Sequence, residues 1–237
     1  MKLDPDLKPA RLVRRYKRFL ADVEIDGQQV TVHCPNPGAM TGLAEPGMTV
    51  WLAPARTPGR KLPFGWELTE IEAPDGRIHV GIHAARANTI AREAIEAGAI
   101  VELCGYASLR SEVRYGEKSR VDFLLEDDAR PPAYVEVKNV HLLRKAGLAE
   151  FPDSVTARGA RHLAELAAQV HAGARAVMLY IVQRSDTDRF ALASDIDPAY
   201  DAAFRQATKA GVEAICYCCT VTPEQIMLER QLPIVES

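Results

Sequence analysis

The first third of the chain alternates short apolar runs with turn-forming residues. Apolar and polar positions alternate with a period near two, and Gly, Pro and Asp separate the runs. The runs occupy residues 16–25, 30–34, 48–55, 65–73 and 77–83. Each predicts a strand, and the last two predict a hairpin across "PDG". About five strands in roughly 80 residues are typical of a small β-barrel, so we expect an OB-like β-barrel here.

The pattern changes near residue 84, where apolar residues begin to recur with helical spacing. Helices are predicted over 87–100, 153–173 and 197–211, and strands over 107–116, 119–126, 133–140, 174–183 and 212–221. The second helix is expected to begin at Asp153 or Ser154 and to end at Gly173. The fold class is therefore α/β (α+β), with one domain over 1–83 and a mixed-sheet domain over 84–237.

Two of these strands carry charges where apolar residues are expected. Asp122 interrupts "RVDFLL", and Glu136 and Lys138 interrupt "YVEVKNV". Side chains at i and i+2 share a strand face, so Glu136 and Lys138 point the same way. Two neighbouring carboxylates repel each other, and bound Mg²⁺ or Mn²⁺ would relieve that repulsion. The alternative is a half-exposed hairpin in which Asp122 pairs with Lys138 or Arg120 and has no other role.

The spacing of Asp122, Glu136 and Lys138 resembles the PD-(D/E)xK motif of the restriction-endonuclease-like superfamily. The predicted order of elements matches the core of that superfamily, although Val121 stands where Pro is common. The resemblance implies a metal-dependent nuclease in which these three residues are catalytic and the two acids bind the metal. An acid on the helix before the sheet often joins such a site. Glu93 fits that role, as does Glu112 on the next strand, and a solvated surface is the alternative for both.

Several longer stretches together resemble the sugar fermentation stimulation protein A family. They are "RRYKRFLADV", "HCPNPGAMTGL", "ANTIAREAIEAGAI", "SRVDFLLE", "YVEVKNV" and "FPDSVTARGARHLAEL". The resemblance implies an OB-like N-terminal domain, a nuclease-like C-terminal domain and DNA binding. Two functions stay open: a DNA-binding nuclease, and a non-catalytic DNA-binding regulator of sugar (maltose-type) metabolism that retains the nuclease fold.

Candidate nucleic-acid contacts lie in both domains. Basic residues with interleaved Tyr16 and Phe19 are suited to phosphate contact and base stacking, and "RTPGRK" (56–61) would flank the same groove. Asn36 lies in a turn-rich loop, and Arg158 shares a helix face with His162. The predicted contacts are Arg14, Arg15, Lys17, Arg18, Asn36 and Arg158. A solvated surface, or a structural turn for Asn36, is the alternative.

Composition adds a few limits. The 237 residues have a net charge of −3, so nucleic-acid binding would need a local basic patch. The absence of a long apolar run and of a signal peptide predicts a cytoplasmic protein without a membrane partner. Five cysteines predict reduced thiols, and the C-x-x-C of Cys216 and Cys219 predicts apolar packing. No phosphate-binding glycine motif indicates an organic cofactor. A homodimer stays open.

Overall fold

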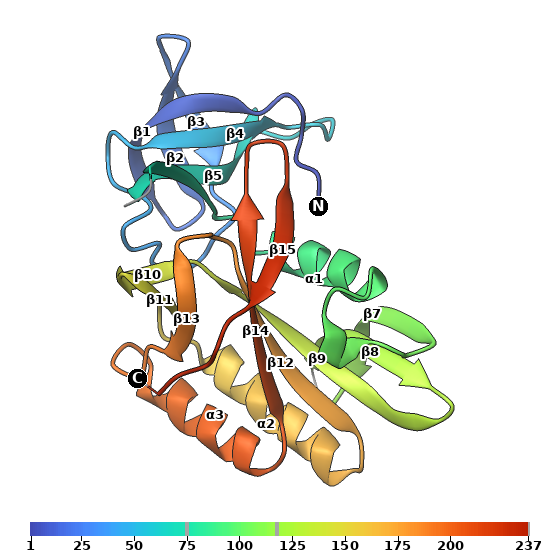
Figure 1. The fold of residues 1–237 in the computed structure, drawn as a ribbon. Coiled ribbons are helices and arrows are strands. Elements are labelled where there is room, and N and C mark those ends of the chain that lie inside the picture. Colours follow the sequence, from blue (N-terminus) through green and yellow to red (C-terminus); the bar gives the residue numbers. More distant parts are fainter. Residues whose placement is uncertain (74–75, 117–118, 237) are drawn as a thin grey trace.

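The N-terminal strands form one sheet in the computed structural model, which describes residues 1–73, 76–116 and 119–236 (Figure 1). The strands are β1 (Lys8–Tyr16), β2 (Leu20–Ile25), β3 (Gln28–His33), β4 (Thr49–Pro54), β5 (Phe64–Ala73) and β6 (Gly76–Gly81). Their order is β3-β2-β1-β4-β5-β6, and β3 also pairs with β5, so the sheet curves back on itself. The predicted β5–β6 hairpin is confirmed, although residues 74–75 of its turn lie outside the described residues.

The strand predicted over 16–25 is wrong in its bounds, because a turn at Lys17–Phe19 divides β1 from β2. Most of β1 precedes the predicted range. Only Ala10 and Leu12 of β1 are buried, so its sequence, "KPARLVRRY", shows little alternation. Inside the sheet, Trp66, Leu12 and Leu52 pack into a core of their own.

The C-terminal domain is built on a mixed sheet with the strand order β15-β14-β12-β9-β8-β7. These strands are β7 (Ser108–Tyr115), β8 (Ser119–Asp127), β9 (Arg130–Val140), β12 (Arg175–Val182), β14 (Glu213–Val221) and β15 (Ile226–Gln231). The central strands β9, β12 and β14 are parallel, and the outer ones are antiparallel to their neighbours. The predicted α/β class is confirmed. β15 was not predicted.

Helices cover both faces of this sheet, as Figure 1 shows. α1 (Arg86–Glu96) packs on one face, and α2 (Ala157–His171) and α3 (Pro198–Lys209) pack on the other. A short 3₁₀ turn, η1 (Val101–Leu103), follows α1. α2 begins later than predicted because Thr156 is its N-cap and accepts a hydrogen bond from the Gly159 amide. The side chain of Asp153, the predicted start, is instead hydrogen-bonded to His141.

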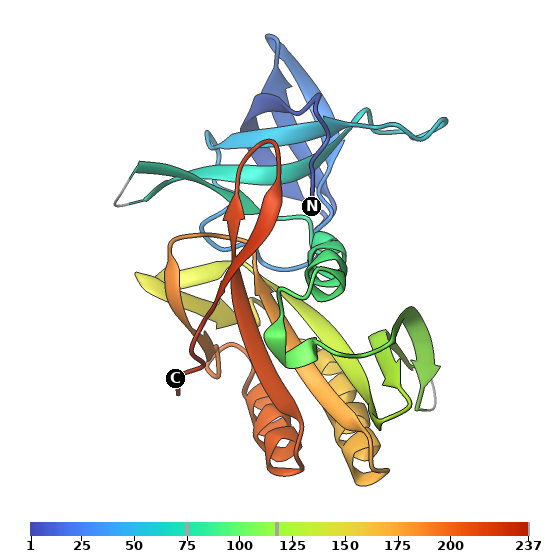
Figure 2. The same ribbon diagram turned by 45° about the vertical axis from the view of Figure 1, so that its right-hand side comes forward.

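A small third sheet, not predicted, lies beside the large mixed sheet. It consists of β10 (Leu142–Lys145), β11 (Gly147–Phe151) and β13 (Thr187–Leu192). Figure 2 shows it below the N-terminal sheet, where it forms part of the junction between the domains.

The first residues of the chain join the two domains. The Met1 amino group donates to the Ile226 carbonyl at 2.8 Å, and the Ile226 amide donates back to the Met1 carbonyl at 2.9 Å. The β14–β15 hairpin extends up to the N-terminal sheet in both views (Figures 1 and 2). The domain junction is therefore held by backbone pairing as well as by side chains.

Two expectations from composition concern the whole fold. Within the described ranges, no helix is both long and apolar enough to cross a membrane. All five cysteines are unpaired. Cys216 and Cys219 lie in two different hydrophobic cores, which confirms that this C-x-x-C serves apolar packing.

Candidate metal centre and nucleic-acid interface

Asp122 and Glu136 come from neighbouring antiparallel strands. Phe123 of β8 pairs with Val135 of β9, and continuing this register by one residue places Asp122 opposite Glu136. One oxygen of Asp122 accepts a hydrogen bond from the Val137 amide at 2.7 Å. The other accepts from the side-chain amide of Asn88, on α1, at 2.6 Å. These two donors fix the Asp122 carboxylate at the edge of the β9 backbone.

Glu136 is buried, with 3% of its surface exposed. Its Oε1 accepts from Lys138 Nζ at 2.6 Å and also contacts Nδ1 of His162. Its Oε2 is buried and has no hydrogen-bond partner among the described residues. A buried carboxylate oxygen without a partner is costly, so this atom calls for a donor or a cation.

Arg158 fixes the tautomer of His162. Nε of Arg158 donates to Nε2 of His162 at 3.2 Å, so Nε2 must be the acceptor nitrogen of the ring. Nδ1 then carries the proton and donates it to Glu136. A neutral histidine satisfies both contacts, and α2 thus presents Arg158 and His162 on one face, as predicted from their spacing.

The two carboxylates have pKa values that move apart. Burial and the charge of Glu136 raise the pKa of Asp122 to about 6, against the hydrogen bonds from Val137 and Asn88. Burial also opposes ionisation of Glu136, but His162 and Lys138 together lower its pKa below the usual value. Glu136 therefore ionises before Asp122 as the pH rises, and a nearby positive charge would favour the ionised form of Asp122.

Two polar residues beside the carboxylates were missed from the sequence. Asn88 is the α1 residue that contacts Asp122. Tyr115 is buried at the end of β7 with no partner for its hydroxyl among the described residues. Burial and the charges of Glu136, Glu165 and Asp122 raise its pKa. A polar residue on the apolar face of α1 was the available signal for Asn88; we see none for Tyr115.

The structure does not bring Glu93 or Glu112 to this cluster. Glu93 is exposed and forms an ion pair with the Met1 amino group at 2.7 Å. It lies five residues after Asn88, roughly 140° around the helix, and therefore faces elsewhere. Glu112 is exposed on β7, with a positive φ of 55°.

The residues present fit a divalent cation that keeps part of its water shell. No group of three or more His, Cys, Asp or Glu side chains within the described residues is arranged to hold a metal. Mg²⁺ does not need such a group, because it is commonly bound by one or two carboxylates together with water and substrate phosphate. The free Oε2 of Glu136 and the neighbouring Asp122 provide that smaller set.

The predicted basic residues of the N-terminal domain divide into two groups. Arg14 is paired with Asp22 at 2.8 Å and lies over the ring of Tyr16, 4.9 Å from its centroid. Arg15 donates to the backbone carbonyls of Asn36, Gly38 and nearby residues. Both therefore have structural partners.

Lys17 and Arg18 form the second group. They lie in the exposed turn between β1 and β2, and no hydrogen bond or ion pair of either side chain is found within the described residues. They are the members of the predicted basic run that remain available to phosphate.

Asn36 stabilises its own loop. It is 2% exposed, its amide donates to the Ile82 carbonyl at 2.7 Å, and its oxygen accepts from the Gly38 amide at 2.9 Å. These contacts are those of a structural turn, the simpler alternative. The loop itself still lines a cavity between the domains.

That cavity has a volume of about 720 Å³. The N-terminal domain contributes Arg15, Arg18 and the loop 36–39, and the C-terminal domain contributes residues of β9, β11 and the segment before α2. Asp153 holds the loop from the other side by accepting from the Met40 amide at 3.1 Å. A Cβ on Gly38 would lie 2.2 Å from Asp153, so only glycine permits this approach.

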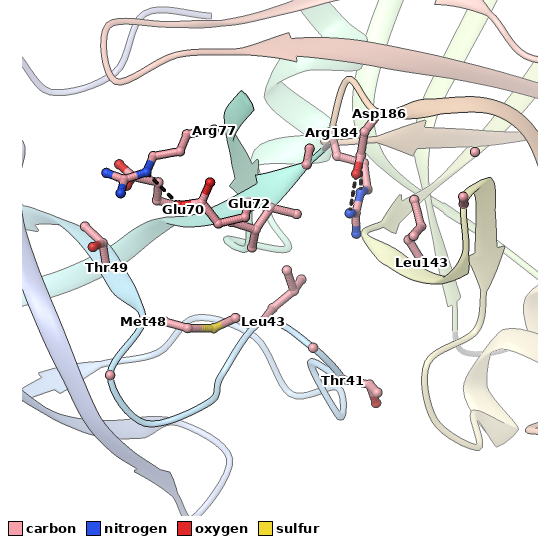
Figure 3. Close-up of a pocket in the computed structure, with 16 residues that line it drawn as sticks. Thr41, Leu43, Met48, Thr49, Glu70, Glu72, Arg77, Leu143, Arg184 and Asp186 are labelled. Carbon is pink, nitrogen blue, oxygen red and sulfur yellow. Dashed lines mark hydrogen bonds and ion pairs between the residues drawn. The ribbon is translucent and has the colours of Figure 1, made fainter. Parts of the chain in front are cut away.

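A second cavity of about 740 Å³ lies across the junction from loop 41–49 to the β10–β11 hairpin (Figure 3). Its charged side chains are paired with one another. Arg77 contacts Glu70 and Glu72, and Arg184 contacts Asp186 at 2.6 Å. Figure 3 shows these pairs as the dashed contacts.

The fold and the site together define a two-domain class: an OB domain joined to a mixed-sheet domain with two carboxylates and a lysine on neighbouring strands. The chain belongs to the sugar fermentation stimulation protein A family. The model "Sugar fermentation stimulation protein RE domain" matches residues 85–225, and "SfsA N-terminal OB domain" matches residues 13–82.

Relatives match the chain over nearly its whole length. A "Sugar fermentation stimulation protein homolog" of Maricaulis maris is 54% identical over 235 residues, which cover 99% of this chain and 98% of the relative. Another, from Rhodospirillum centenum, is 55% identical over 233 residues and 98% of each chain. The solved structure of Pyrococcus furiosus SfsA in complex with Ca²⁺ has a TM-score of 0.87 and 27% identity, covering 99% of this chain and 98% of that one.

Proposed function

We propose that this protein is a metal-dependent nuclease that hydrolyses phosphodiester bonds in DNA. Residues 1–83 form the unit that holds the nucleic acid, and residues 84–237 carry the chemistry. Asp122 and Glu136 hold Mg²⁺ or Mn²⁺, and Lys138 is the third catalytic residue. The observation that carries the proposal is the buried, unpartnered Oε2 of Glu136 beside a second carboxylate.

The comparisons support a divalent metal. The P. furiosus relative was solved in complex with Ca²⁺, a hard cation that takes oxygen ligands as Mg²⁺ does. When bound, such a metal activates water and stabilises negative charge on the scissile phosphate. The neighbouring Asp122 and Glu136 are the residues of this chain that would hold it.

The remaining residues position the substrate. Lys138 lies on the same strand face as Glu136, where its ammonium group can bind a phosphate oxygen of the strand. The exposed Arg158 uses Nε for His162, and its other nitrogens have no acceptor among the described residues, so it can contact the next phosphate. His162 keeps Glu136 in place through its Nδ1 proton.

The test is a cleavage assay on single-stranded DNA, duplex DNA, RNA and branched DNA, each with Mg²⁺ and with Mn²⁺. We expect the wild type to cut at least one substrate, and Glu136→Gln to lose that activity while it still binds the substrate. Glu126→Gln, an exposed acid on β8 away from the site, is the matched control and should cut like the wild type. No cleavage of any substrate with either metal would contradict the proposal and favour a non-catalytic DNA-binding regulator.

A further inference from the structure

An exposed aromatic ring stands at the tip of the β1–β2 turn. Phe19 has 46% of its surface exposed, although large apolar side chains are mostly buried elsewhere in the N-terminal domain. Its ring lies nearly parallel to that of His33, at 17°, with the centroids 6.5 Å apart. Arg60, from the basic loop 56–61, contacts Nδ1 of His33 at 3.4 Å. The turn, β3 and this loop thus bring two rings and a guanidinium group together.

The two residues before Phe19 add charge at a strained backbone position. Lys17 and Arg18 have φ values of 49° and 62°, a region that residues other than glycine rarely adopt. Such conformations cost free energy and cluster at binding sites. Both residues are exposed and directly precede Phe19 in the turn.

Arg18 also lines the interdomain cavity of about 720 Å³. This volume is in the range of small-ligand pockets, roughly 300 to 1,000 Å³, so it suits a nucleotide and not a duplex. Loop 36–40, which forms one wall of the cavity, is held in place by hydrogen bonds to Arg15 on one side and Asp153 on the other. Val155, which is 75% exposed, offers an apolar contact at the far wall.

The cavity borders two segments of the chain that also carry candidate site residues. Asn139, one residue after Lys138, lines the cavity, and so does Thr156, two residues before Arg158. Arg18 thus brings to the cavity a cation without a partner among the described residues, and Phe19, the next residue, brings an exposed aromatic ring to the same turn. An aromatic ring beside a cation is the arrangement that binds the bases and phosphates of a single strand.

We infer that this turn and the interdomain cavity bind a single, unpaired nucleic-acid strand, with one base stacked on Phe19 and a neighbouring nucleotide in the cavity. The inference rests on the proposed nuclease function and names its substrate class. Phe19 and Arg18 act as specificity residues, because a base offers its free face to an aromatic ring only when it is not paired within a duplex.

The test uses the full-length protein with a chelator, so that no turnover is needed. Short DNA strands with 2-aminopurine at successive positions are titrated, alone and annealed to a complement, and an RNA strand is titrated in parallel. We expect tighter binding of single strands than of duplex, and quenching of the 2-aminopurine fluorescence at one position. Phe19→Ala should weaken single-strand binding about tenfold, abolish that quenching at saturation and leave duplex binding unchanged.

Met227→Ala is the matched control, since Met227 is an equally exposed apolar residue on β15. It should bind like the wild type. Equal binding of single strands by Phe19→Ala and wild type, or a preference for duplex, would overturn the inference. Quenching that depends on Phe19 without any cleavage in the assay above would uphold the inference and refute the nuclease proposal, so the two can fail separately.

Discussion

The two cavities at the domain junction have nearly the same volume but differ in whether their charged side chains are paired. In the cavity of Figure 3, the charged side chains are neutralised in pairs, as in Arg77 with Glu70 and Arg184 with Asp186. The cavity beside α2 has Arg18 at its wall, and the Arg18 side chain has no partner among the described residues. Side chains that form ion pairs with one another stabilise the junction, whereas a charged side chain without a partner is available to a ligand. The contrast makes the second cavity the candidate for ligand binding and the first a part of the structural junction.

The largest effect should come from removing the lysine of the candidate metal centre, Lys138, which is paired with Glu136. Lys138→Met should lower the rate of cleavage at least a hundredfold, the usual loss when one preorganised donor to the transition state is removed. Substrate affinity should change little, because most phosphate contacts lie elsewhere. Cleavage kinetics under single-turnover conditions measure the change, and Lys145→Met, an exposed lysine on β10, is the control. A rate within threefold or so of wild type would remove Lys138 from the site.

Removing a charged side chain that is already paired within the protein should instead affect folding. Arg184 is buried, binds Asp186 with two nitrogens and donates to the His141 carbonyl at 2.7 Å. Arg184→Ala would leave that carboxylate and carbonyl without partners, so we expect a loss of about 4 kcal/mol in the free energy of unfolding. Urea denaturation checks this value. An unchanged midpoint would mean that the pair does not hold the junction.

The pH dependence of stability should reveal the repulsion between the carboxylates. The pKa of Asp122 is raised to about 6 in the metal-free protein, above the ordinary value of 3.8, so its ionisation opposes folding. Stability should fall as pH rises from about 4 to about 6, by up to about 3 kcal/mol. Asp122→Asn should not show this fall. Urea titrations of both proteins across this window measure the difference, and parallel curves would contradict it.

The smallest effect distinguishes two exposed arginines of the N-terminal domain. Arg18→Ala should weaken nucleic-acid binding by about tenfold at low salt and reduce the slope of log Kd against log salt, because one phosphate contact is lost. Arg77→Ala should change neither, since Arg77 is paired with Glu70 and Glu72. Filter binding over a range of salt concentrations measures both slopes. Equal slopes for the two variants would contradict the claim that only the cavity lined by Arg18 binds nucleic acid.

Strand alternation was enough to anticipate part of the central cluster. Local periodicity is enough to place Glu136 and Lys138 on one strand face, whereas Asp122 was linked to them by the resemblance to the PD-(D/E)xK motif; the structure brings the three together. Glu93 shows the limit of this reasoning. Its position on α1 was clear, but its direction depends on the phase of the helix, which leaves Glu93 exposed and paired with the Met1 amino group, away from Asn88.

Features that depend on tertiary contacts could not be anticipated. β10, β11 and β13 form a sheet from segments distant in sequence, and their short runs lack clear alternation. Asn36 and Arg15 carry no local sign that they bind one another across a loop. The sequence also gives no sign that the Tyr115 hydroxyl is buried close to the carboxylates of Glu136 and Asp122.

The central claim is that Asp122 and Glu136 hold a divalent cation, and Mn²⁺ tests it most directly because its position can be located by anomalous scattering. Crystals of the full-length protein would be soaked in Mn²⁺ and measured near the manganese edge. We predict one strong anomalous peak between the two carboxylates, with Oε2 of Glu136 as a ligand. The absence of a peak there, with Glu136 Oε2 still unpartnered or bound to another side chain, would contradict the account.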